Sequence, residues 1–87
     1  MSVRAELTPN PNAIKFTTDS IIFEGDGSIS VRSGETSEHE IMNSLLKLEG
    51  VDNVFGYQNF ITVSKEFTAD WDELTAKVKG VFAQYDF

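Results

Sequence analysis

The sequence contains no cysteine, one histidine, two prolines and half as many basic as acidic residues. Without cysteine the chain can form no disulfide and offers no thiolate to a metal. Seven basic residues are dispersed along a chain of net charge −7, so we expect it to bind neither nucleic acid nor an anionic membrane surface. No apolar run approaches the length that a membrane-spanning helix needs.

Residues 1–6 resemble neither a secretory signal peptide nor an Arg-rich transit peptide. We therefore expect a soluble cytoplasmic protein, and a monomer. Its 87 residues are enough for one domain, over residues 1–87, with one modest core. The apolar fraction of 40% and seven phenylalanines favour a packed core over disorder.

Apolar and polar residues alternate in several short segments, which predicts strands. The expected strands lie at residues 2–7, 13–17, 21–24, 28–32, 52–57 and 60–65. Gly25-Asp26-Gly27 and Gln58-Asn59 between consecutive segments predict hairpin turns. The strand at 2–7 should be half-buried, because its apolar residues all fall on one face.

Two helices follow from capping signals and apolar stripes. Ser37 and Glu40 have the spacing of a capping box, and the helix should run to about Leu48. Asp70 is positioned to cap a second helix, which begins with Trp71 and continues to the chain's end. The element order is then β-β-β-β-α-β-β-α. Short connections favour antiparallel pairing, so we expect a two-layer α+β domain with a mainly antiparallel sheet of five to six strands and both helices on one face.

Motifs that would indicate catalysis or a metal site are missing from the sequence. His39 stands alone at a helix start, where a surface residue is expected rather than a ligand, since zinc needs three or four ligands. Glu35, Glu38 and Glu40 gather at the same helix start, where the helix dipole favours acidic side chains. The sequence therefore predicts no enzyme, no cofactor and no metal.

The stretch at residues 8–16, TPNPNAIKF, contains both prolines. Because proline fixes φ and restricts the preceding residue, the stretch predicts a stiff loop that leads into a strand. Stiff loops often bear binding residues, although the residues alone favour a rigid connector whose asparagines satisfy their own backbone. The predicted partner-binding residues are Asn10, Pro11, Asn12 and Lys15, with Tyr57, Gln58 and Asn59 of the second hairpin.

This proline stretch resembles the opening motif of the N-terminal domain of Nfu-type (NifU-like) iron–sulfur cluster scaffold proteins. GVDNVFGYQNFITVSK at residues 50–65 is similar to that domain's second motif, and ADWDEL at residues 69–74 to the start of its last helix. In the family a second domain with a Cys-x-x-Cys pair holds the cluster, and the present sequence resembles a free-standing N-terminal domain without that pair. The resemblance implies an accessory module of iron–sulfur cluster assembly or delivery, which contacts a scaffold, carrier or recipient protein without binding the cluster itself.

Two other functions are compatible with the residues. The domain could be a general peptide- or protein-binding module unrelated to iron, which uses an exposed sheet edge or the proline loop. It could also bind a small anion or a phosphopeptide near Lys15. The sequence does not identify the partner.

Overall fold

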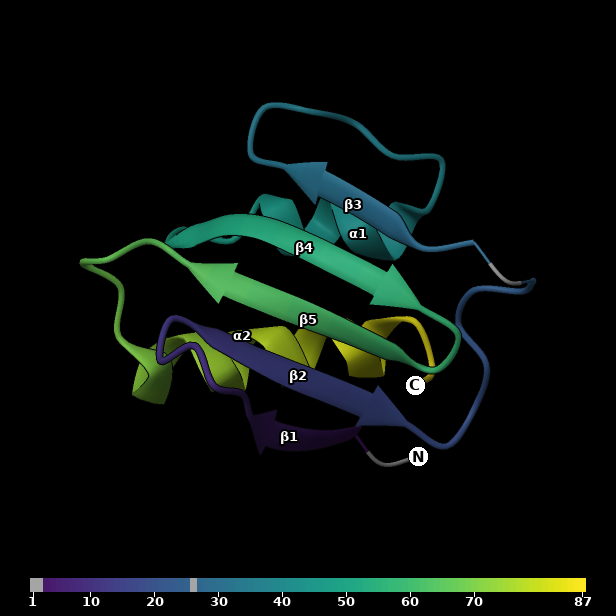
Figure 1. The fold of residues 1–87 in the computed structure, drawn as a ribbon, viewed down its shortest axis with the longest axis horizontal. Helices are drawn as coiled ribbons and strands as arrows, with labels where there is room; N and C mark the ends of the chain where they lie inside the picture. The colour runs from purple at the N-terminus through teal and green to yellow at the C-terminus, as the bar shows by residue number, and fades with distance from the viewer. Residues whose placement is uncertain (1–2, 26) are drawn as a thin grey trace.

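The computed structural model describes residues 3–25 and 27–87, and these form five strands and two helices. In chain order the elements are β1 (Val3–Leu7), β2 (Ala13–Thr18), β3 (Ile29–Arg32), α1 (Glu40–Leu46), β4 (Val51–Tyr57), β5 (Phe60–Lys65) and α2 (Trp71–Gln84). The strands make one sheet in the order β1-β2-β5-β4-β3, with antiparallel neighbours throughout. Both helices lie behind the same face of the sheet (Figure 1). The predicted two-layer α+β fold is confirmed.

The core lies between the sheet and the two helices, because alternate residues of a strand point to opposite faces. Ile14 and Phe16 of β2 are buried while Lys15 between them is not, as the alternation predicted. The largest fully buried side chains include Phe16, Phe23, Met42, Leu45, Val54, Ile61, Val63, Val78 and Phe82. Neither helix in the described part of the chain is long and apolar enough to cross a membrane.

The strand expected at residues 21–24 does not form. Instead the chain crosses the end of the sheet, where the amides of Ile22 and Phe23 both donate to the carbonyl of Gln58, at 2.8 and 2.9 Å. A short apolar run indicates burial but not which element is buried, and here it is a loop that inserts Phe23 into the core. The turn expected at residues 25–27 includes Asp26, which lies outside the described residues, and β3 pairs with β4.

Phe23 fits under β4 because Gly56 faces the core without a side chain. A Cβ at Gly56 would collide with the Phe23 ring and would lie 3.2 Å from Cε of Met42. His39 packs against the same ring in an edge-to-face arrangement, with centroids 4.9 Å apart. The single histidine is thus a packing residue at the start of α1.

The capping box predicted for α1 is wrong. The N-cap residue is His39 and makes no side-chain cap hydrogen bond, so the helix starts later than Ser37. The Ser37 hydroxyl accepts from the His39 amide two residues on, at 3.1 Å. Asn43 then fixes the approach to the helix, because its side-chain amide bonds both the N–H and the C=O of Ser37, at 2.8 and 2.9 Å.

Strand β1 was expected to be half-buried but is largely exposed. Ala5 is exposed and Leu7 is 90% exposed on the face of the sheet that the helices cover elsewhere. The reason is that β1 is an edge strand and the helix layer covers mainly the central strands (Figure 1).

Helix α2 begins as predicted. The Asp70 carboxylate accepts from the amide of Asp72 at 3.0 Å, and Leu74, Val78 and Phe82 are buried along one stripe. Trp71 is half-buried against the core, and its indole N–H donates to the carbonyl of Pro11 at 3.1 Å. The first turn of α2 therefore tethers the proline loop.

We predict that Gly56→Ala lowers the free energy of unfolding by about 1–3 kcal/mol, the usual cost of overpacking a core. Gly80→Ala is the matched control, because a Cβ at this exposed helical position meets nothing within 4 Å and should stabilise by up to about 1 kcal/mol. Urea denaturation of both variants measures the two effects. Equal midpoints for Gly56→Ala and the parent would show that Phe23 does not lie under β4.

We predict that Trp71→Ala lowers the free energy of unfolding by about 3 kcal/mol. This is the lower end of the range for truncating a large aromatic side chain, because Trp71 is half-buried. Trp71→Phe retains most of the packing and loses the bond to Pro11, so it should cost about 1 kcal/mol. It should also speed amide exchange at Ala13, whose N–H bonds the carbonyl of Asn10 in the tethered loop. If Trp71→Phe changes neither the free energy of unfolding nor the exchange rate of the Ala13 amide, the Trp71–Pro11 hydrogen bond does not stabilise the loop.

Candidate functional site

The proline loop owes its shape to hydrogen bonds among its own residues. The Asn10 side-chain oxygen accepts from the amide of Asn12 at 2.9 Å, and the Thr8 hydroxyl contacts the carbonyls of Asn10 and Ala13, both at 2.9 Å. The carbonyl of Asn12 accepts from the amide of Lys65 at 2.8 Å, which joins the loop to the end of β5. Asn10 therefore has a structural task, as the rigid-connector interpretation supposed.

Gln58 and Asn59 also make hydrogen bonds that stabilise the fold. Gln58 adopts φ of +50° in the turn between β4 and β5, and its carbonyl accepts the two amides of the crossing segment described above. The Asn59 side chain donates to the carbonyl of Thr18 at 3.1 Å, and the Thr18 amide donates to the Asn59 carbonyl at 2.8 Å. Both residues hold the end of β2 and the crossing segment against the hairpin.

The two halves of the predicted binding surface lie at opposite ends of the sheet. Asn12 is beside the C-terminal end of β5, whereas Asn59 is beside the C-terminal end of β2. The six residues of β2 separate them by roughly 20 Å. The structure thus does not unite residues 10–12 with residues 57–59 into one contact patch.

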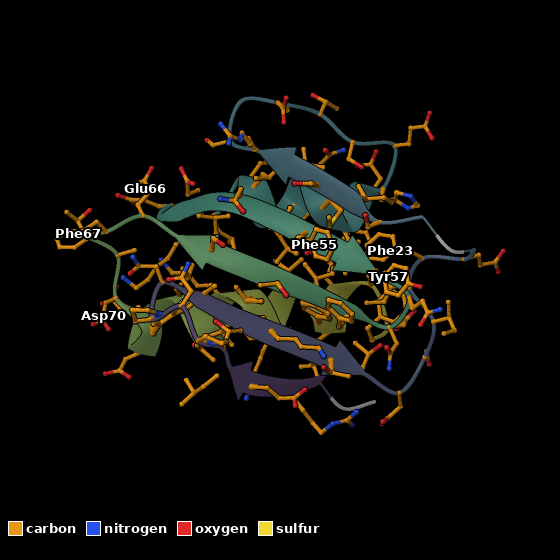
Figure 2. All side chains as sticks on the ribbon, viewed as in Figure 1. Phe23, Phe55, Tyr57, Glu66, Phe67 and Asp70 are labelled. Atoms are coloured by element: carbon orange, nitrogen blue, oxygen red, sulfur yellow. The ribbon has the colours of Figure 1, made fainter. Side chains whose placement is uncertain are left out.

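The structure instead brings Lys15 and Tyr57 together on the open face of the sheet, the face that no helix covers. The register aligns Thr17, Phe60 and Tyr57 in one row across β2, β5 and β4, and Lys15, Thr62 and Phe55 in the next. Phe60 lies at the centre, with its ring centroid 6.1 Å from that of Tyr57 and 6.2 Å from that of Phe55. Figure 2 shows Phe55 and Tyr57 on β4, on the side toward the viewer.

Lys15 completes this cluster. Its ammonium nitrogen lies 4.4 Å from the centroid of the Phe60 ring, a cation–π contact. The described residues contain one ion pair, between Arg4 and Asp19 at 2.8 Å, so Lys15 forms none. We call Lys15, Phe55, Tyr57 and Phe60 the aromatic–lysine patch. Phe55 is 37% exposed, which leaves an aromatic edge in contact with solvent.

Phe55 and Phe60 were missing from the sequence-based site, although a signal for them was present. On a sheet that is buried on one face, the alternate residues of each strand face solvent and are expected to be polar. In β4 and β5 the solvent-facing positions include Phe55, Tyr57 and Phe60. Aromatic residues in the polar half of an alternating pattern indicate a surface with a use beyond folding.

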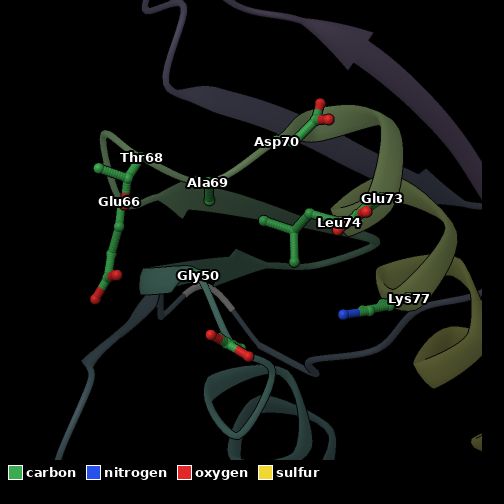
Figure 3. Close-up of a pocket in the computed structure, with 9 residues that line it drawn as sticks. Gly50, Glu66, Thr68, Ala69, Asp70, Glu73, Leu74 and Lys77 are labelled. Carbon is green, nitrogen blue, oxygen red and sulfur yellow. The ribbon is translucent and has the colours of Figure 1, made fainter.

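A groove of about 270 Å³ opens where β5 leads into α2. Glu49, Glu66, Asp70 and Glu73 line it together with Lys77. Figure 3 shows Glu66, Asp70 and Glu73 spread apart from one another around it. Within residues 3–25 and 27–87, no group of three or more His, Asp or Glu side chains could hold a metal ion.

The acidic residues near the start of α1 also belong to no group of described side chains that could hold a metal ion. The Glu35 carboxylate accepts from the backbone amide of Arg32 at 2.8 Å and so closes the turn after β3. Glu40 is the acidic residue in the first turn of α1, where the helix dipole favours it.

Comparison with protein families matches residues 3–86 to the family described as scaffold protein Nfu/NifU N terminal. Conserved virulence factor C of Staphylococcus aureus (strain bovine RF122 / ET3-1) is 32% identical over 81 residues, which make up 93% of this chain and 21% of that protein. A NifU-like protein of Schizosaccharomyces pombe is 33% identical over 85 residues, 95% of this chain and 33% of that protein. The chain spans between a fifth and a third of the length of these relatives.

Solved structures show the same fold. The crystal structure of protein SAV1430 from Staphylococcus aureus is 35% identical, with a TM-score of 0.84 over 94% of this chain and 99% of that one. The solution structure of SeR13 from Staphylococcus epidermidis is 26% identical, with a TM-score of 0.66 over 99% of this chain and 100% of that one. With the family match over residues 3–86, the chain belongs to the family of the Nfu/NifU N-terminal domain.

Proposed function

We propose that this domain is a non-catalytic accessory module of iron–sulfur cluster assembly or delivery. In this role it contacts a cluster scaffold, carrier or recipient protein and does not hold the cluster itself. The observation that supports the proposal most directly is the family match over residues 3–86, which includes nearly every described residue. Membership of a family named for Nfu and NifU scaffold proteins supports a role related to iron–sulfur cluster biology.

The absence of cysteine from the sequence supports a contact role rather than a cluster-holding role. Iron–sulfur clusters are held mainly by Cys thiolates, with histidine as an occasional substitute. His39 is half-buried against Phe23 and has no histidine or cysteine beside it to complete a ligand set. A domain of this composition can assist cluster transfer by binding a protein that supplies the ligands.

The contact surface that we propose is the aromatic–lysine patch. Aromatic side chains are enriched at protein interfaces, because they bury a large area at a small cost in side-chain entropy. Lys15 and Tyr57 were already predicted from the sequence as binding residues, and Phe55 and Phe60 now join them. It remains a prediction that the protein is cytoplasmic, is a monomer and does not bind nucleic acid.

A general peptide-binding role unrelated to iron remains the second candidate. It is favoured by the exposed edge of β1, where Leu7 is 90% exposed and the free backbone groups of an edge strand could pair with an extended peptide. The identity of captured proteins separates this role from the first, as described below.

We predict that the domain alone retains no cluster. Anaerobic incubation with iron and sulfide, followed by desalting, should leave a colourless protein with substoichiometric iron. A protein with a four-cysteine cluster site, treated in parallel, checks that the procedure loads clusters. A brown parent protein with stoichiometric iron would contradict the proposal.

We predict that Lys15→Ala weakens the capture of partner proteins and hardly changes stability, whereas Asn10→Ala lowers stability and leaves capture unchanged. The immobilised domain should recover cluster-assembly or cluster-recipient proteins from a lysate, as identified by mass spectrometry. Lys15→Ala should weaken this capture. It should lower the free energy of unfolding by less than about 1 kcal/mol, the value of an exposed cation–π contact. Asn10→Ala should cost about 1 kcal/mol of stability through its lost loop bond, with unchanged capture by the folded fraction.

Either of two results would contradict these expectations. Recovery of proteins with no link to iron–sulfur clusters would favour the general peptide-binding role. Undiminished capture by Lys15→Ala would remove the aromatic–lysine patch from the contact surface.

A further inference from the structure

The outer side of strand β1 is an exposed edge of the sheet. β1 pairs with β2 on one side, and Figure 1 shows no other described segment beyond its other side. The strand at the opposite edge, β3, is shorter, with four residues against five, and the chain after it turns back past its outer side (Figure 1). β1 therefore offers the freer edge for pairing with a further strand.

The bonding pattern of β2 shows which of its residues bond β1. In an antiparallel pair, both backbone groups of one residue point to the same neighbouring strand, and consecutive residues point to opposite sides. The Asn12 carbonyl accepts from the amide of Lys65, and the Thr18 amide donates to the carbonyl of Asn59. Even-numbered residues of β2 therefore bond β5, and odd-numbered residues bond β1.

The register with β2 then divides the residues of β1. Arg4 and Glu6 stand opposite odd-numbered residues of β2, so their backbone groups bond that strand. The N–H and C=O groups of Val3, Ala5 and Leu7 point away from β2, along the outer edge. The register of β1 with β2 is continuous, so no bulge interrupts this row of donors and acceptors.

The side chains of β1 have a symmetry of their own. Val3, Ala5 and Leu7 face the side of the sheet that bears the helices, where Leu7 is 90% exposed. Arg4 and Glu6 lie on the open face and are both exposed. Read backwards from the central alanine, the segment VRAEL exchanges an arginine for a glutamate and a valine for a leucine.

We propose that the edge of β1 pairs with the same edge of a second copy of this chain, antiparallel and centred on Ala5. In this arrangement Ala5 faces Ala5 of the second copy, Val3 faces Leu7 of the second copy, and Arg4 faces Glu6 of the second copy. The outward backbone groups of the two strands then make about six hydrogen bonds. The exposed leucine of each copy is covered by the valine of the other.

Charge selects this register over its neighbours. A shift of two residues in either direction keeps the apolar residues on the helix side, but it places Arg4 opposite Arg4 or Glu6 opposite Glu6 of the second copy. Like charges that are directly opposite destabilise a pair of strands, and opposite charges stabilise it. The register centred on Ala5 is the one in which each arginine faces a glutamate.

Both charged residues also have partners within their own chain. A guanidinium nitrogen of Arg4 bonds Asp19 at 2.8 Å. A carboxylate oxygen of Glu6 accepts from the Thr17 hydroxyl at 2.7 Å, and Glu6 stands opposite Lys15. Because a guanidinium has five donors and a carboxylate about four acceptor sites, each can add a contact across the edge. We assign the charges to the choice of register, and the affinity to the backbone hydrogen bonds and the covered leucine.

An unrelated extended peptide could also bond the outward backbone groups of β1. Such a peptide would need its charges in the reverse order of this edge, a condition that a second copy meets by two-fold symmetry. The sequence does not reveal the order of the strands, so the monomer that we expected from it was stated without knowledge of this edge. The monomer is the competing outcome of the test.

The test measures self-association of the whole chain by sedimentation equilibrium and by amide chemical shifts, from about 10 μM to about 2 mM. Two paired strands of five residues each bury less than the roughly 1,200 Å² of a stable complex, so the dimer is weak. We expect half of the chains to pair at roughly 0.1–1 mM. The amide shifts that change with concentration should centre on β1.

Proline at the centre of the edge should block the pairing. Ala5→Pro removes an outward N–H that does not bond β2, and proline is tolerated in an edge strand at such a position. We expect this variant to stay monomeric over the whole concentration range, with little change in its thermal midpoint. Ala5→Ser is the matched control, because it retains the donor and the small side chain, and it should change association less than about twofold.

Exchange of the charges tests the register itself. Arg4→Glu and Glu6→Arg each place like charges across the edge and should weaken association at least about tenfold. In an equimolar mixture of these two variants, every acidic edge faces a basic edge, so association should return to within about threefold of the parent. Lys79→Glu makes the same change in net charge as Arg4→Glu at an exposed position of α2, and should alter association less than about twofold.

Four results would overturn the inference. They are a monomer at every concentration, concentration-dependent shifts away from β1, undiminished association of Ala5→Pro, and a mixture of the charge variants that associates no better than either alone. If the parent stays monomeric and its β1 amides shift with a peptide of alternating valine and threonine, the edge belongs to the general peptide-binding role instead. The measurements contain no cluster-assembly protein, so they stand apart from the capture experiment.

Discussion

The burial of Phe23 under the side-chain-free Gly56 is the constraint on which the order of the strands depends. The chain must pass from β2, near one edge of the sheet, to β3, which forms the other edge. It does so through an irregular segment that is fixed at one point by the Phe23 ring and at another by the carbonyl of Gln58. A loop can cross the end of a sheet stably only if its backbone groups are satisfied, and the β4–β5 turn supplies those partners.

Much of this fold could be predicted from local patterns, because most elements obey a single period. Strands β2, β3, β4 and β5 show alternation, and Ile41, Leu45, Leu74 and Val78 fall on helical stripes. The failures share a cause, which is that tertiary contacts decided the outcome. Phe23 was assigned to a strand because the apolar pattern predicted its burial but did not predict that it packs against Gly56. Ser37 matched a capping box, yet Asn43 and the Phe23–His39 contact set the helix start.

Of the predicted binding residues, Lys15 and Tyr57 lie near each other on the open face, whereas residues 10–12 lie at the far end of the sheet. That error came from treating the whole proline stretch as one unit. The strand β2 that follows the loop separates the asparagines from the hairpin by its full length, a distance that depends on the pairing of β2 with β5. Phe55 and Phe60 could have been found, because both occupy solvent-facing positions in otherwise regular alternation.

The two faces of the sheet differ in how far their residues are bound to the core. Val54, Ile61 and Val63 point to the helices and are fully buried, so substitutions there cost stability. Phe55 and Phe60 alternate with them on the same strands and face solvent on the other side. Because alternate strand positions are independent in their packing, the open face can change its aromatic and charged residues with little effect on the core. The domain can in this way keep one fold while the exposed residues of its open face change.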